Sequence, residues 1–291
     1  ITAVVLIPFT SGLVKLSTMI VKDEKKQEQR HPELHTLDEK LYISPAVAVA
    51  EATKAVAAMG SLAKENFARG CNQLFKYSED EAKLIDTEED YLDNFADSSD
   101  HFLVGLSKMI ETEHDDRQVD MLMQTVPNFE RVGDYATNMV ELAQRLQKEN
   151  SGFSESAKQE LQILCSAVNE ILDITVAAFA TDDLEAAKKI EPLEEIIDDM
   201  VMILRDRHTK RLKMGVCSIG SGLVFMESLT YLERASDQCS SIALLMLARH
   251  NEEILTNHYD YVRHLHEGTD KHYASELRRR RAEYVDRLYH I

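Results

Sequence analysis

The chain has 291 residues, of which only 10 are glycine and 5 are proline. Because these residues make most of the turns in sandwiches, barrels and propellers, those classes are disfavoured and long helices are expected. The formal net charge of −18 repels a phosphate backbone, so nucleic acid is a poor partner. The four cysteines show no C-x-x-C spacing, which predicts reduced thiols rather than a zinc site or a disulfide framework.

The first segment, residues 1–21, is apolar except for Lys15. Its length fits the end of a transmembrane helix, and a buried helix of a globular domain is the alternative. Residues 22–40 are rich in charge and are expected to form a linker. The chain begins with Ile rather than Met, so we expect it to be a piece of a longer protein.

The rest of the chain predicts an all-α fold. Apolar residues recur with a helical period and no strand pattern competes with them. The expected helices are 41–76, 79–111, 116–149, 154–181, 183–213, 219–250 and 270–289.

Local signals mark where these helices begin and where the chain turns. Three pairs have the spacing of a helix-start capping box. They are Thr36 with Glu39, Ser78 with Glu81, and Asp182 with Glu185. Gly152 and Gly215 are expected to supply turns, the second at the tip of a helical hairpin.

Four copies of an acidic motif, E-x-x-x-D, form an internal repeat. Each half of the chain has one copy on its second expected helix and one on its third. The eight carboxylates are Glu89, Asp93, Glu130 and Asp134 in the first half, and Glu194, Asp198, Glu233 and Asp237 in the second. The midpoint between the two copies falls near residue 110 in the first half and near 214 in the second. If each helix pair is an antiparallel hairpin, the paired motifs face each other roughly 30 Å from the turn.

Four facing carboxylates predict a cation site. The E-x-x-x-D spacing puts two carboxylates on one helix face, where like charges cost about 0.2–0.5 kcal/mol per pair. A bound cation offsets this repulsion, and helical bundles commonly hold such sites. A solvated acidic face is the alternative. Asn138, one turn after Asp134, is a candidate accessory ligand, whereas Arg131 and Arg234 are expected to pair with acids across helices.

Redox chemistry at a di-iron centre is disfavoured. Carboxylate-bridged di-iron sites in bundles use two E-x-x-H motifs, and the helical repeats offer only Glu111-x-x-His114, at an expected turn. A di-iron oxidoreductase is therefore the weaker alternative, and we expect no enzymatic activity. In the tail, Arg278–Arg281 alternates with acids and predicts a salt-bridged helix face, while His266 and its neighbouring histidines are expected at the surface.

The segments Asn128–Ala143 (NFERVGDYATNMVELA) and Tyr231–Ala243 (YLERASDQCSSIA) resemble the third-helix motifs of PhoU-type phosphate-regulatory domains. The resemblance implies two tandem three-helix bundles, here 41–150 and 151–250, followed by a helical tail at 251–291. It also implies that the eight repeated carboxylates bind multinuclear metal clusters, with iron or zinc as the expected metal.

Two further stretches, Val5–Leu16 and Cys217–Asp237, resemble sodium/phosphate cotransporters that carry a C-terminal PhoU domain. This implies a regulatory region at the cytoplasmic face of the membrane, with the transport module in the same polypeptide as its partner. A free-standing cytosolic PhoU-type regulator is the alternative. A signalling partner and a homo-oligomer stay open under both interpretations.

Overall fold

The computed structural model describes residues 31–267 and 270–291, and within these ranges all regular structure is helical. The all-α prediction is therefore confirmed for the described residues. The predicted transmembrane segment 1–21 and most of the predicted linker lie outside them. The described end of that linker contains two short 3₁₀ helices, η2 (Pro32–His35) and η3 (Glu39–Ile43).

Two three-helix bundles and a helical tail make up the molecule. The first bundle consists of α3 (Pro45–Gln73), α4 (Glu79–Ser107) and α5 (Glu113–Lys148). The second consists of the long helices α6 (Glu155–Thr181), α8 (Ile190–Lys213) and α9 (Ile219–His250), with the short α7 (Leu184–Ala187) between α6 and α8. The tail contains α10 (Glu252–Thr256), α11 (His258–His266), α12 (Lys271–Arg280), the π-helical segment η4 (Arg281–Val285) and α13 (Asp286–Leu288).

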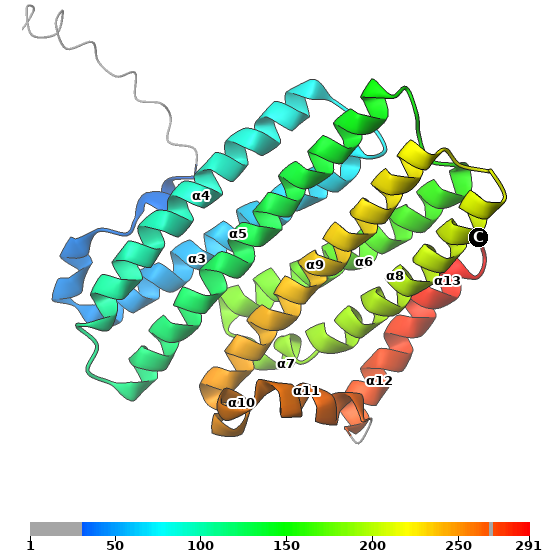
Figure 1. Cartoon of the computed structure of the whole chain (residues 1–291). Helices are drawn as coiled ribbons and strands as arrows, with labels where there is room; N and C mark the ends of the chain where they lie inside the picture. The colour runs from blue at the N-terminus through cyan, green and yellow to red at the C-terminus, as the bar shows by residue number, and fades with distance from the viewer. Residues whose placement is uncertain (1–30, 268–269) are drawn as a thin grey trace, which may run out of the picture.

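The bundles lie side by side with their long helices roughly aligned. Figure 1 shows α4, α5, α9 and α8 as one row, with α3 and α6 behind it and α12 beside α8. Contacts between α5 and α9 and between α3 and α6 join the bundles. A continuous, mainly aliphatic core runs through both. The acidic motifs on α4, α5, α8 and α9 consequently all belong to one row of helices.

Most helix positions follow the sequence expectations, with three corrections. Ser78 caps α4 by accepting a hydrogen bond from the Glu81 amide, as predicted. Thr36 ends η2 instead of starting a helix, because Asp38 takes the cap of η3. Asp183, not Asp182, caps α7, and the expected helix 183–213 is interrupted between α7 and α8.

The turns between helices use three residues with positive φ. Gly215 has φ +68° at the tip between α8 and α9, as predicted. Gly152 lies in the connection between the bundles, as predicted, but the positive φ of that turn falls on Asn150 (φ 46°). Asn, like Gly, adopts the left-handed region at modest cost because its short side chain bonds locally. Asp182 (φ 54°) ends α6 in the same way.

Two described helices, Pro45–Gln73 and Glu155–Thr181, are long and apolar enough to cross a membrane, with mean hydropathies of 1.3 and 1.7. However, 50% and 61% of their apolar windows are buried inside the structure. Core helices of a folded bundle pass the same test, so these helices are weak support for a membrane span.

The tail is anchored by an almost fully buried arginine. Arg280 is 2% exposed and contacts Glu276 (3.0 Å), Glu283 (3.3 Å) and Glu170 of α6. Tyr284 also donates a hydrogen bond to Glu170. The salt-bridged face predicted for the arginine run is confirmed, and it ties α12 and η4 to the second bundle.

α3 and α5 approach each other closely at Gly70. A Cβ at Gly70 would lie 2.7 Å from the Ala136 carbonyl oxygen, which is backbone and has no way to move aside locally. Ala136 follows the acidic motif of α5 by two residues. The absence of a side chain at Gly70 therefore lets the first bundle close beneath this motif.

We expect Gly70→Ala to destabilise the protein by about 1–3 kcal/mol, because the methyl group forces α3 and α5 apart. Gly152→Ala is the control, since nothing lies within 4 Å of its Cβ position. Urea unfolding followed by circular dichroism measures both. Equal midpoints for the two variants would contradict the close packing.

Candidate metal centres

The first acidic cluster joins α4 to α5. Glu89 and Asp93 lie one turn apart on α4, and Asp134 approaches them from α5. Their carboxylate oxygens all lie within 4.8 Å of one another. The turn that makes this possible runs through residues 108–112, where counting along the sequence had placed it. We call these three residues the first triad.

The second acidic cluster repeats this arrangement between α8 and α9. Glu194 and Asp198 share one face of α8, and Asp237 approaches from α9. Their carboxylate oxygens also lie within 4.8 Å of one another. These residues form the second triad, and its three members match those of the first triad position for position in the repeat.

The remaining predicted ligands lie outside the triads. Arg205 of α8 contacts Glu233 at 2.5 Å, which holds this carboxylate as an ion pair. Burial, followed by the charges of Asp134 and Asp93, raises the pKa of Glu130. This carboxylate therefore lies near the first triad. Among the described residues, Asn138 makes no side-chain hydrogen bond, and its role as an accessory ligand stays a prediction.

The surroundings of the first triad disfavour the ionised form of its carboxyl groups. Burial, followed by the charges of Asp93 and Asp134, raises the pKa of Glu89 to about 7. The pKa values of Asp93 and Asp134 are raised as well, in both cases mainly by burial. These carboxylates repel one another when ionised, and Arg131 offsets only part of the effect on Asp134.

The second triad is more deeply enclosed. Burial, followed by the charges of Glu191 and Asp198, raises the pKa of Glu194 to about 9. Burial and the charge of Asp237 raise that of Asp198 to about 6. One oxygen of Asp198 is buried and has no hydrogen-bond partner among the described residues. An oxygen of this kind, next to two other carboxylates, is suited to a metal ion.

The tail accounts for part of this enclosure. Glu191, which is 8% exposed, accepts a hydrogen bond from Ser240 and lies 3.1 Å from Nε2 of His266. Tyr273 of α12 donates a hydrogen bond to Glu195. His266 is exposed, as predicted, but it also contacts Glu191, because α11 folds back over the start of α8. Helical periodicity carries no signal for such a long-range contact.

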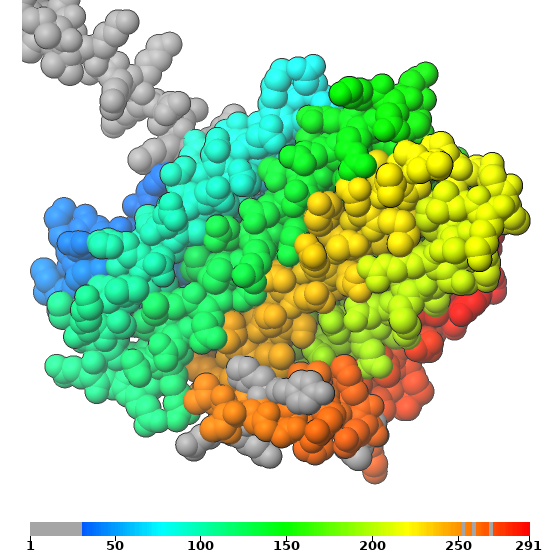
Figure 2. Space-filling view, viewed as in Figure 1, coloured from blue at the N-terminus to red at the C-terminus, as the bar shows by residue number. Residues whose placement is uncertain are grey.

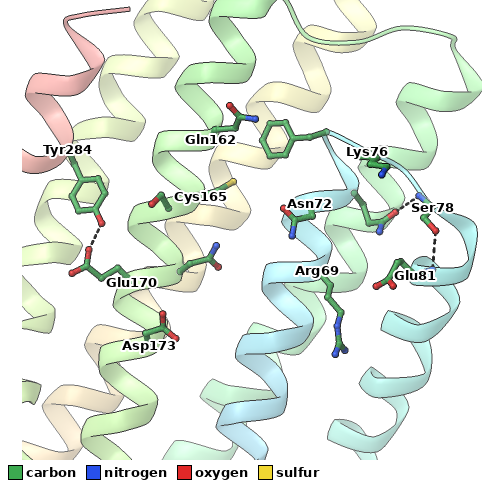
Figure 3. Close-up of a pocket in the computed structure, with 14 residues that line it drawn as sticks. Arg69, Asn72, Lys76, Ser78, Glu81, Gln162, Cys165, Glu170, Asp173 and Tyr284 are labelled. Carbon is green, nitrogen blue, oxygen red and sulfur yellow. Dashed lines mark hydrogen bonds between the residues drawn. The ribbon is translucent and has the colours of Figure 1, made fainter.

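A hollow that the sequence did not predict lies between α3 and α6, on the row of helices behind the one that carries the triads. It is a groove of about 900 Å³ between the end of α3 and the middle of α6, bordered by Tyr284. Figure 3 shows Arg69 and Lys76 on the α3 side and Glu170 and Asp173 on the α6 side. The lining thus mixes both charges. Neither triad contributes a residue to it.

Two tandem three-helix bundles, each with a carboxylate triad across its second and third helices, define the class of this protein. The PhoU domain family matches residues 56–143 and 161–246, one match in each bundle. The chain belongs to the PhoU domain family. The tail lies beyond the matched residues.

Relatives and solved structures agree with this assignment. The chain is 23% identical over 126 residues to the phosphate-specific transport system accessory protein PhoU homolog 1 of Thermotoga maritima, covering 43% of this chain and 53% of the relative. It is 23% identical over 189 residues to the PhoU homolog of Synechocystis, covering 64% and 81%. The chain thus spans about half the length of the first of these relatives.

The fold is also similar to that of two crystal structures. PhoU from Pseudomonas aeruginosa has a TM-score of 0.65 at 21% identity, covering 72% of this chain and 98% of that one. The phosphate transport system regulatory protein PhoU from Streptococcus pneumoniae has a TM-score of 0.64 at 20% identity, covering 72% and 99%. These names describe accessory and regulatory proteins, which is consistent with the expectation of a non-enzyme.

The raised carboxyl pKa values predict that the metal-free protein loses stability as pH rises. A carboxyl group whose pKa is higher in the folded than in the unfolded state stabilises the fold only while protonated. Stability is therefore lost from about pH 4.5 through about 7 for Glu89 and about 9 for Glu194. In a chelator, we expect a lower melting temperature at pH 8.5 than at pH 5.5.

Glu194→Gln should flatten this decline and stabilise the metal-free protein at pH 8.5 by about 1 kcal/mol or more. Glu111→Gln, in the exposed α4–α5 turn, is the matched control and should keep the wild-type slope. Thermal melting of all three proteins in the same buffers makes the measurement. A decline that is unchanged in Glu194→Gln would assign the pH dependence to other groups.

Proposed function

We propose that this protein is a metal-binding PhoU-type accessory protein that regulates phosphate transport. The observation that supports metal binding is the duplicated triad, with three carboxylates at the same place in each bundle. The observation that supports phosphate transport is membership of the PhoU family, whose relatives are named as accessory and regulatory proteins of phosphate transport.

The triads suit a metal ion in number and type of ligand. Three carboxylates supply hard oxygen donors and leave coordination positions open for water or another ligand. A metal ion bound there, for which we propose iron or zinc, would supply positive charge that offsets the carboxylates. Each triad takes two residues from one helix and one from the next, so binding would fasten α4 to α5 and α8 to α9.

The free-standing regulator accounts for the relatives better than a transporter fusion does, because the relatives are named as separate accessory proteins. A link to a sodium/phosphate cotransporter rests on the resemblance of residues 5–16 and 217–237, the first of which lies outside the described residues. In both forms the proposed partner is a phosphate transport module at the cytoplasmic face of the membrane.

The metal hypothesis predicts one metal centre for each triad. Asp134→Asn should abolish binding in the first bundle and Asp237→Asn in the second, each halving the bound metal, while the double variant should bind almost none. Elemental analysis after reconstitution and gel filtration measures the stoichiometry. Asp116→Asn is the control, because it changes an exposed acid on α5 that lies outside both triads. Equal metal content in all four variants would falsify the assignment of the ligands.

The regulatory hypothesis makes a separate prediction in cells. In a host strain that lacks its own PhoU protein, the wild-type chain should change phosphate uptake, and the Asp134→Asn/Asp237→Asn variant should have less effect at equal expression. Uptake of labelled phosphate makes the measurement, with Asp116→Asn as the control. If the double variant regulates uptake like the wild type, then metal binding is not needed for regulation.

A further inference from the structure

The two triads flank a seam between α5 and α9 whose register is known from three contacts. Tyr135 of α5 stacks on Tyr231 of α9, with ring centres 5.9 Å apart. Toward one end Gln118 meets Arg249, and toward the other Arg145 meets Glu227. The helices are therefore antiparallel, and each step forward on α5 corresponds to one step back on α9. Figure 2 shows α5 and α9 meeting side by side on this face.

Two arginines occupy the same level of this seam. Arg131 is four residues before Tyr135, and Arg234 is three residues after Tyr231, so both lie on the helix faces that carry the tyrosine stack. In the antiparallel register their backbone heights differ by about 3 Å or less. Both side chains are exposed.

These arginines lack the ion pairs that the sequence predicted. In residues 31–267 and 270–291, neither guanidinium group has a salt bridge or a hydrogen bond of its own. They nevertheless lie at the seam, because each is within about one helical turn of a stacked tyrosine. The hydroxyl of Tyr135 also makes no hydrogen bond within the described part of the chain. Two guanidinium groups at one level, and a tyrosine hydroxyl about one turn away, are thus left without a partner in the described residues.

The surrounding charge determines when an anion could bind there. Asp134, next to Tyr135 on α5, belongs to the first triad, and Asp237 on α9 belongs to the second. With both triads metal-free, their ionised carboxylates oppose an anion held by two arginines. With a divalent cation in each triad, most of this negative charge is offset, so that the two arginines are free to hold an anion.

From this arrangement we infer that the α5–α9 seam binds inorganic phosphate through Arg131 and Arg234, and only when the triads hold metal. A guanidinium group presents a planar set of donors that matches two oxygens of a tetrahedral oxyanion. Two such groups at one level, within one helical turn of the Tyr135–Tyr231 stack, match a small anion with several acceptor oxygens. This inference rests on the proposed metal binding and adds a ligand that the fold alone does not assign.

The test measures binding of labelled inorganic phosphate by equilibrium dialysis to the full chain loaded with zinc and freed of excess metal. The wild type should bind phosphate, and Arg131→Gln/Arg234→Gln should bind it at least tenfold more weakly at the same metal content. The chelated wild type should also bind at least tenfold more weakly. Arg287→Gln, an exposed arginine of α13, is the matched control and should bind like the wild type.

The metal content of every sample separates the two hypotheses. Loaded protein that binds no phosphate, or binds it equally well in the double variant, overturns the seam site and leaves the metal centres intact. Chelated protein that binds phosphate as tightly as loaded protein overturns the metal requirement. A wild type that takes up no metal contradicts the proposed function itself. Circular dichroism confirms that the double variant is folded.

Discussion

The main constraint on this structure is that like-charged carboxylates are held together in the middle of two helical hairpins. Such a cluster is unfavourable by itself, and it persists because the helices that carry it are fixed by contacts elsewhere. Gly70 lets α3 approach the backbone of α5, and the aliphatic core aligns α8 with α9. The packing energy of the bundles thus maintains an arrangement that the charges oppose. This is the general condition for a preformed cation site: the scaffold bears the repulsion before the cation arrives.

The hairpins and their acidic pairs were predictable from the sequence because both follow from local rules. Turn residues and the distance between repeated motifs determine which residues of an antiparallel pair share a level, and this placed Asp134 opposite Glu89 and Asp93 correctly. The fourth carboxylate of each set could not be assigned by counting. Glu233 is turned to Arg205, whereas the position equivalent to Arg205 in the first repeat is Asp100. That difference appears only when side chains on different helices are seen together.

The contacts between the bundles and with the tail were not predictable from helical periodicity. A period of 3.6 residues shows that a face is apolar, but not which helix covers it. The stack of Tyr135 on Tyr231, the pairing of Arg249 with Asp182 and the contact of His266 with Glu191 all join residues far apart in the chain. The groove between α3 and α6 escaped prediction for the same reason.

The two halves therefore share the spacing of their acidic motifs, but equivalent residues differ in burial. Asp86 of the first repeat is exposed, whereas Glu191, its equivalent in the second, is buried beneath the tail. Glu89 and Glu194 are equivalent in the same way, yet burial raises the pKa of the second much further. A cation that binds the second triad therefore has to displace a more tightly held proton, that of Glu194, than one that binds the first. Since α5 and α9 carry one member of each triad and meet at the tyrosine stack, the two unequal centres share a single boundary, and the charge at that boundary depends on both.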